Sequence, residues 1–284
     1  MRTTYGATVA KRRLARRLVE LRVENGYTAN QVCDKLNWGR GKVGRFEANV
    51  WKRPEMSDVR DLLRIYGVPD ADREDLEALA MLARGRSWWR EYSDVFEDGE
   101  YAGFESDAVR ISLYMPLILP GLLQTTAYTE AHMHVGTKSA QWRARALEAR
   151  QRRQQVLEPS DDGPGVELVA VLTEASLLYH WGTQEQRRAQ ITHLVAMSQR
   201  PNVEIRLLRF ADGPHPGMSS LISIFDFPGD EPGIVYLEND AAVQQLDAVA
   251  DVEVYKKIFA EIRSAALEPG ATTEYLEKLA DTLD

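Results

Sequence analysis

Three basic side chains, Arg40, Lys42 and Arg45, lie close together in a stretch of the chain that runs from Thr28 to Pro54. Arginine and lysine at such spacing can donate hydrogen bonds to base edges in the major groove of DNA. The stretch has the pattern of two short amphipathic helices joined by a tight turn, with the basic residues on the second helix. A helix of this length, held clear of the body by a partner helix, fits the major groove. The spacing therefore predicts sequence-specific DNA binding.

A preceding helix is expected to hold these two helices in place. It should run from about Ala10 to Glu24, because Leu14, Leu18 and Leu21 recur at helical spacing. Gly26 should end it as a left-handed cap.

The first helix of the pair begins at Thr28, whose hydroxyl is placed to cap it together with Gln31 in a capping box. Val32 should face inward. In the second helix Val43 and Phe46 point inward, which leaves the basic residues on other faces. Further amphipathic helices are expected over about 56–66, ended by Gly67, and over about 72–84.

Three glycines weaken the second helix of the pair: Gly39, Gly41 and Gly44. Each glycine inside a helix costs about 0.5–1 kcal/mol relative to alanine. Gly39 also forfeits most of a good N-cap. We therefore expect a helix that is soft when free and firms up on DNA.

The charge of the chain changes sign along its length. Up to Gly67 there are 15 Lys and Arg against 7 Asp and Glu, a net charge of +8, whereas the remaining 217 residues carry 20 against 36, a net charge of −16. Opposite halves of this kind indicate two surfaces with different partners.

Residues 10 to 68 resemble the XRE or phage-repressor type of helix-turn-helix in their Thr28 start, their apolar positions and their Lys52-Arg53-Pro54 exit. In that family a helix-one arginine pairs with the glutamate that ends the recognition helix, and Arg22 and Glu47 hold those places. The resemblance implies that Arg40, Lys42 and Arg45 contact bases, with guanine favoured by arginine. It also implies phosphate contacts, which give affinity without sequence information, from Thr28, Lys52, Arg53, Arg12 and Arg16.

The remaining residues predict a larger domain in which helices flank a central sheet. Strands are expected over about 166–173, 203–210, 221–227 and 233–237, and helices over about 140–157, 184–199, 242–267 and 273–282. The fold class is therefore α+β overall, with an all-α helix-turn-helix domain (1–84) followed by an α+β domain (85–284).

Several stretches of this half together resemble the WhiJ-like, antitoxin-like regulators of actinobacteria. They are Trp88-Trp89-Arg90-Glu91-Tyr92, residues 119–125, 150–154 and 172–177, and Val235-Tyr236-Leu237-Glu238. The resemblance implies a transcription regulator whose second domain is a sensor or interaction module. Its ligand would be a small partner protein or a small-molecule effector.

Residues able to do chemistry in this half are few. Glu174 and Glu238 each follow a predicted strand, and His215 lies between prolines in a turn. These three are candidate ligand contacts, although a helix-start carboxylate explains Glu174 better and a turn residue explains His215 better. His132 and His134 would point to opposite sides of a helix and so predict no shared metal. Phosphate loops, zinc spacings and nucleophile elbows are absent, and we expect neither a cofactor nor an enzyme.

The bulk features complete the prediction. Cys33 is the single cysteine, no apolar run approaches a membrane span, and the N-terminus lacks an apolar signal region, so a cytoplasmic protein is expected. A palindromic DNA site needs two recognition helices about one turn apart, so we expect a homodimer bound to double-stranded DNA. The alternative is an antitoxin-like interaction module that sequesters a small partner protein, with weak or vestigial DNA binding.

Overall fold

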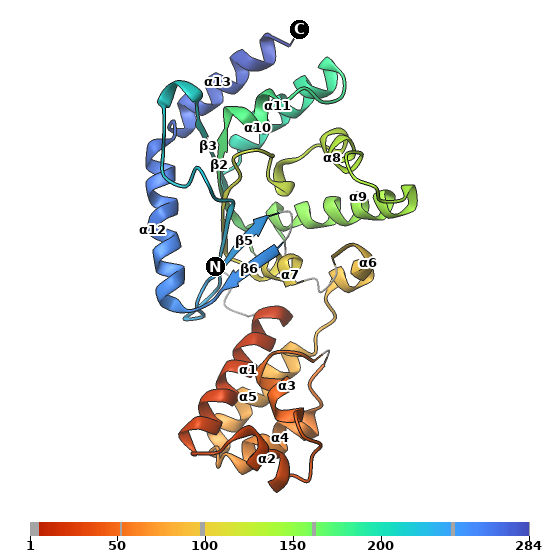
Figure 1. Ribbon diagram of the computed structural model, residues 1–284, viewed down its shortest axis with the longest axis vertical. Helices are drawn as coiled ribbons and strands as arrows, with labels where there is room; N and C mark the ends of the chain where they lie inside the picture. The colour runs from red at the N-terminus through yellow and green to blue at the C-terminus, as the bar shows by residue number, and fades with distance from the viewer. Residues whose placement is uncertain (1–5, 52, 97–99, 161–162, 240–241, 284) are drawn as a thin grey trace. The chain divides into compact units, whose positions relative to one another are not determined.

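The computed structural model describes residues 6–51, 53–96, 100–160, 163–239 and 242–283. Contacts within the chain divide these residues into two compact units. The helical unit comprises residues up to 91 together with 100–107, and the sheet unit comprises 92–96 and the described residues from 108 onward. Figure 1 draws most of the helical unit in red and orange and the sheet unit in yellow to blue. The predicted α+β class is confirmed.

The helical unit packs its helices around one apolar core. The inward stripe of α1 supplies Leu14, Leu18 and Leu21, and Val43 and Phe46 fill the core from the second short helix, as the periodicity predicts. The helices are α1 (Ala7–Glu24), α2 (Ala29–Lys35), α3 (Lys42–Glu47), α4 (Met56–Ile65), α5 (Asp70–Ala83) and α7 (Glu100–Asp107), with a 3-10 turn η1 (Trp88–Tyr92).

Helix α7 belongs to this unit although it lies far along the chain from α1. The Asp107 carboxylate accepts a hydrogen bond of 2.8 Å from the backbone N–H of Val9, in the first turn of α1. A carboxylate at this position also complements the positive end of the helix dipole. Gly103 allows the close approach, since a Cβ there would lie 2.4 Å from the Thr8 hydroxyl. The helical unit thus continues beyond residue 84, and the functional division into 1–84 and 85–284 stays a prediction.

The sheet unit is built on six strands in the order β3-β2-β1-β4-β5-β6. β1, β2 and β3 are parallel, and β4, β5 and β6 run antiparallel to their neighbours. The strands are β1 (Arg110–Tyr114), β2 (Glu167–Thr173), β3 (Val203–Leu208), β4 (Ile222–Asp226), β5 (Ile234–Asn239) and β6 (Ala242–Leu246). After Glu167 every residue of β2 is buried, as expected for a strand covered on both faces.

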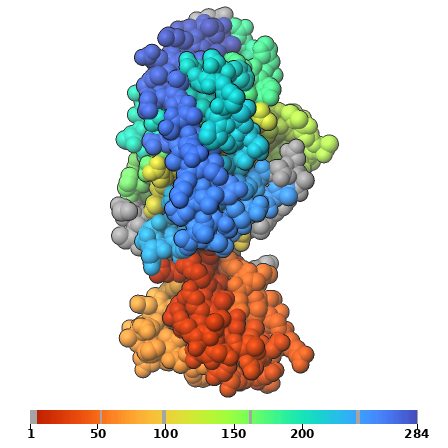
Figure 2. Space-filling view, turned by 60° about the vertical axis from the view of Figure 1, so that its left-hand side comes forward, coloured from red at the N-terminus to blue at the C-terminus, as the bar shows by residue number. Residues whose placement is uncertain are grey.

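Helices cover both faces of this sheet. The inward side of α12 supplies Val252, Phe259 and Ile262 to a core with one sheet face, and α8, α9 and α11 lie on the other side in Figure 1. Figure 2 looks onto the face where the blue atoms of the last part of the chain cover the sheet. The helices are α6 (Ser93–Phe96), α8 (Thr126–Met133), α9 (Ala140–Gln154), α10 (Glu174–Leu178), α11 (Gln184–Ser198), α12 (Val249–Ala265) and α13 (Pro269–Asp281), with 3-10 turns η2 (Gly121–Leu123), η3 (Gln155–Leu157) and η4 (Phe210–Asp212).

One predicted element is wrong at its start. The expected helix over 242–267 begins only at Val249, and Ala242–Leu246 instead forms strand β6. β6 pairs antiparallel with β5, with Leu237 opposite Gln244. The edge of β5 offers backbone groups that need partners, and this demand overrides the weak helical preference of a five-residue segment.

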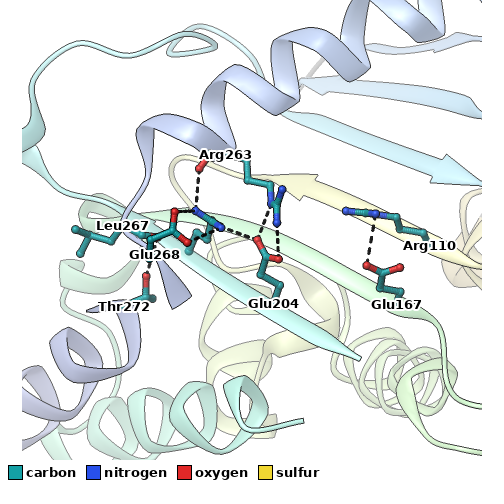
Figure 3. Close-up of polar contacts among 8 residues, drawn as sticks. Arg110, Glu167, Glu204, Arg263, Leu267, Glu268 and Thr272 are labelled. Carbon is teal, nitrogen blue, oxygen red and sulfur yellow. Dashed lines mark hydrogen bonds and ion pairs between the residues drawn. The ribbon is translucent and has the colours of Figure 1, made fainter. Parts of the chain in front are cut away.

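A chain of ion pairs ties β3 to the two last helices (Figure 3). Arg206 is buried and donates to both carboxylate oxygens of Glu268, at 2.9 and 2.8 Å. Glu204 accepts from Arg263 of α12 at 2.6 and 2.8 Å and from Arg206 at 2.6 Å. The hydrogen bonds from Arg263 and then Arg206 lower the pKa of Glu204 to about 2.

Candidate nucleic-acid interface

The helix pair that the sequence singles out is present as α2 and α3. Thr28 caps α2, with its hydroxyl oxygen accepting from the Gln31 N–H at 3.2 Å and the Gln31 side chain accepting from the Thr28 N–H at 2.8 Å. The predicted capping box is confirmed. It satisfies two backbone donors that a free helix end would leave without partners.

The turn between the two helices is longer than the positions of the glycines predict. It runs through Asn37 at φ 52° to Gly41 at φ 82°, and α3 begins at Lys42. Gly41 is therefore the N-cap residue, in the left-handed region that favours glycine. The prediction that Gly39 is the N-cap and that Gly41 weakens the helix from within is wrong, because Gly41 is the N-cap and Gly44 is the glycine inside α3.

Two tryptophan rings, one before α3 and one after it, contact an aromatic ring inside the helix. Trp38 stacks on Phe46 with ring centroids 6.3 Å apart, and Phe46 meets Trp51 at 5.6 Å. The Trp51 indole donates to the Phe46 carbonyl at 3.1 Å, and the Lys11 ammonium lies 5.0 Å from the Trp51 ring centroid. Trp38 thus helps to hold the start of α3, and Trp51 holds the segment that follows its end. Sequence reasoning missed this role, although Trp38 and Trp51 flank the helix symmetrically.

The far end of α3 is tied to α1. Arg22 donates to both carboxylate oxygens of Glu47, with Nη2 3.1 Å from Oε2, and its Nη1 donates to the Tyr27 carbonyl at 2.7 Å. The two side chains are 17% and 13% exposed. These are the residues at which the resemblance placed a structural ion pair. A bidentate pair of this kind fixes orientation as well as distance.

The near end of α3 is tied to α4 through Lys42. Its ammonium donates to Asp58 at 2.7 Å and lies 4.0 Å from the centroid of the Trp38 ring. The cation is therefore held within the helical unit by an ion pair and a cation–π contact. The structure thus gives Lys42 a positioning role, and its contact with a base stays a prediction.

The other predicted contacts differ in exposure. Arg40 lies in the turn, Arg45 on α3 and Arg53 after α3, and all three are exposed, with no side-chain hydrogen bond to another described residue. Thr28 is exposed too. Arg16 lies 3.9 Å from Glu20 one turn along α1.

Of the two remaining predicted phosphate contacts, Arg12 and Lys52, the structure describes only Arg12. Arg12 is 9% exposed, so the structure does not present its guanidinium to a phosphate, and that prediction is corrected. The resemblance from which the prediction came extends over residues 10 to 68, and so takes no account of α7, which packs on α1. Lys52 lies outside the described residues.

The three candidate ligand residues of the sheet unit have different neighbours. Glu174 begins α10, and its oxygens accept from the Tyr275 hydroxyl at 2.6 Å and from the Phe210 N–H. These bonds give Glu174 a positioning role between the ends of β2 and β3. His215 packs edge-on against Tyr114 at 5.9 Å, and Glu238 is exposed on β5 opposite Val243.

Burial and Glu174 together raise the pKa of Tyr275 to about 12, so the phenol keeps its proton and donates. Among the described residues no group of three His, Cys, Asp or Glu side chains could hold a metal ion. Within the same residues no helix is long and apolar enough to cross a membrane.

Comparisons with known families match two parts of the chain. A helix-turn-helix domain matches residues 13–76, which supports a DNA-binding regulator rather than an enzyme. A domain of unknown function, DUF5753, matches residues 99–278. Neither the curated proteins nor the solved structures compared with it contain a match. The chain therefore belongs to the family defined by the DUF5753 domain, here preceded by a helix-turn-helix domain.

Proposed function

We propose that the protein is a sequence-specific transcription regulator that reads DNA with α3 and the turn before it. The observation that carries the proposal is the placement of Arg45 and Arg40, two exposed arginines on a helix and turn that are braced at both ends. Bracing matters because a base contact needs a guanidinium whose backbone is already in place. Arg53 follows α3 and is suited to a phosphate.

The sheet unit is proposed to receive the signal that changes DNA binding. The residues after Gly67, among them those of the sheet unit, carry a net charge of −16. This negative charge disfavours a second DNA surface and supports a different partner for the sheet unit. We keep His215 and Glu238 as candidate contacts, since both side chains have accessible surface. The resemblance to WhiJ-like, antitoxin-like regulators of the XRE type adds a small partner protein to the possible ligands.

The proposal is tested by selecting the preferred DNA site from a random library and measuring affinity by mobility shift. Arg45→Ala should lose about 1–3 kcal/mol on the selected site and relax the preference at one base pair. Arg53→Ala should weaken all sequences alike and lower the slope of log affinity against log salt by about 0.9.

Arg64→Ala is the matched control, because Arg64 is an exposed arginine of α4 outside the proposed contact set. It should leave site preference unchanged. Undiminished binding by Arg45→Ala would reject α3 as the recognition helix. A full chain without measurable DNA affinity that co-purifies with a small protein would favour the antitoxin-like alternative.

A further inference from the structure

The last strand of the sheet unit leaves one edge of the sheet open. β6 is the outermost strand in the sheet order and, among the described residues, pairs with β5 alone. In an antiparallel pair, successive residues direct their N–H and C=O groups alternately toward the partner strand and away from it. Within the part of the chain that the structure describes, residues 243–246 form no backbone hydrogen bond outside the ladder with β5. We call the outward groups of Ala242–Leu246 the β6 edge.

The β6 edge is exposed to solvent and has no protecting feature. Residues 242–245 are exposed, with Val243 50% exposed, and Leu246 is half-buried. The β5–β6 register runs over five consecutive pairs without a bulge. Proteins usually protect an open edge strand with lysine, proline or a bulge. Since β6 has none of these, its edge can accept a further strand.

The chain itself closes the opposite edge of the sheet. The Leu207 carbonyl of β3 accepts a hydrogen bond of 2.9 Å from the backbone N–H of Leu267, which follows α12. Arg206 of the same strand is buried and donates to Glu268 at 2.9 and 2.8 Å. Of the two edges in the described part of the sheet, β6 is therefore the one that is open to a partner.

The charge around β6 indicates which kind of strand this edge accepts. β6 itself carries no charged residue, whereas residues 227–252, which include it, contain six Asp and Glu and no Lys or Arg. Asp247 directly follows the strand, and Glu238 of β5 is exposed opposite Val243. A second copy of the chain would bring this acidic segment against itself. Lys or Arg at the ends of an incoming strand would instead meet opposite charge.

We propose that the β6 edge binds an extended strand of a partner protein, whose uncharged middle is as long as β6 and is flanked by Lys or Arg. The incoming strand continues the sheet, so its main chain supplies affinity and its alternate side chains supply specificity. On one face of the sheet Leu237 and Leu246 pack against the core that α12 covers. A β-branched or aromatic side chain beside Leu246 extends this core.

The inference deepens the proposed function by naming the partner surface of the sheet unit, and its role as a signal rests on that function. Strand binding is measured without DNA, so the two proposals fail separately. Arg45→Ala should weaken DNA binding and leave strand binding unchanged. A chain that binds the strand but has no measurable DNA affinity would reject the proposed function and keep the β6 edge as a binding surface.

The first test measures binding of a labelled synthetic peptide to the full chain by fluorescence anisotropy. The probe is Lys-Lys-Thr-Val-Thr-Val-Thr-Lys-Lys, and a matched peptide carries Glu in place of the four Lys. The lysine peptide should bind saturably and at least about tenfold more tightly than the glutamate peptide. A lysine peptide with prolines at two adjacent central positions lacks one backbone donor on each of its edges and should not bind.

A charge reversal beside the strand should change which peptide is preferred. Asp247→Lys should weaken binding of the lysine peptide and strengthen binding of the glutamate peptide, because the charge next to β6 changes sign. Glu277→Lys is the matched control, since it makes the same charge change at an exposed position of α13. It should keep the wild-type preference.

The second test removes a backbone donor from the β6 edge. Gln244 and Gln245 are adjacent in β6, so the N–H of one points toward β5 and the N–H of the other points away from it. Proline is tolerated on an edge strand only where its missing N–H would face solvent. One of Gln244→Pro and Gln245→Pro should therefore unfold at the wild-type temperature and bind the lysine peptide at least about tenfold more weakly, and the other should unfold at a lower temperature.

Three results would overturn the proposal. The first is a lysine peptide that shows no saturable binding, or that binds as well with prolines in its middle. The second is equal binding of the lysine and glutamate peptides, or an unchanged preference in Asp247→Lys. The third is a wild-type oligomer that dissociates in the proline variant with unchanged unfolding temperature, since the occupant of the edge would then be a second copy.

Discussion

At the scale of single residues, the pair Arg22–Glu47 decides how firmly α3 is held. Both side chains are mostly buried, and Arg22 also satisfies the Tyr27 carbonyl. Removing one partner of such a pair leaves the other charge partly desolvated and uncompensated. The loss therefore exceeds the net worth of the pair itself.

We predict that Glu47→Ala destabilises the helical unit by about 2 kcal/mol, with a coupling energy to Arg22→Ala of about 1–2 kcal/mol in a double-mutant cycle. Urea unfolding measures both. The control cycle uses Arg17 and Glu20, an exposed pair on α1 at 3.0 Å, whose coupling should stay below about 0.5 kcal/mol. Equal couplings in the two cycles would contradict a special role for the Arg22–Glu47 pair.

At the scale of elements, α3 depends on what surrounds its six residues more than on its own propensity. A helix this short is unstable alone in water. Arg22 holds its end, Lys42 with Asp58 holds its start, and Trp38 and Trp51 enclose Phe46. The positions of the arginines that face away from the core follow from these contacts.

The two glycines of this element should respond oppositely to the same substitution. Gly44→Ala should stabilise the unit by about 0.5–1 kcal/mol, because Gly44 lies inside α3 and a Cβ there meets nothing within 4 Å. Gly41→Ala should destabilise it by about 1 kcal/mol, because φ is 82° there. Thermal or urea unfolding measures both signs. Two changes of the same sign would show that α3 does not begin at Lys42.

At the scale of the whole molecule, a net charge of −8 hides a basic N-terminal part and an acidic remainder. The sheet unit contains the Arg263–Glu204–Arg206–Glu268 chain of ion pairs, which links β3 with α12 and with the segment before α13. Its stability should therefore depend on the charge of Glu204.

The sign of this dependence follows from the pKa. Folding lowers the pKa of Glu204 from an ordinary value of 4.5 to about 2, so its stabilisation is present above pH 4.5 and is lost as the pH falls toward 2. We predict that Glu204→Gln lowers the free energy of unfolding at pH 7 and flattens its decline between pH 4.5 and pH 2. Urea unfolding at stepped pH values measures the profile. Glu277→Gln, at an exposed position of α13, should keep the wild-type profile, and an equal flattening there would contradict the role of Glu204.

The sequence by itself determined the local features, those that depend only on residues close together along the chain. The Thr28–Gln31 capping box, the inward positions of α1 and α3, and the buried strand β2 follow from residue types at fixed spacing, because helix and strand periods are local. The partners Arg22 and Glu47 came from a family resemblance. The match to a helix-turn-helix domain supports the function to which these features point.

Only the tertiary structure decided which side chains remain available. α7 comes from far along the chain to cover part of α1, where Arg12 is buried, and Asp58 and Trp38 engage Lys42. Pairing with β5 turns residues 242–246 into a strand. The physical reason is the same in each case: burial, ion pairing and strand pairing depend on residues that are distant in sequence, and local periodicity carries no information about them.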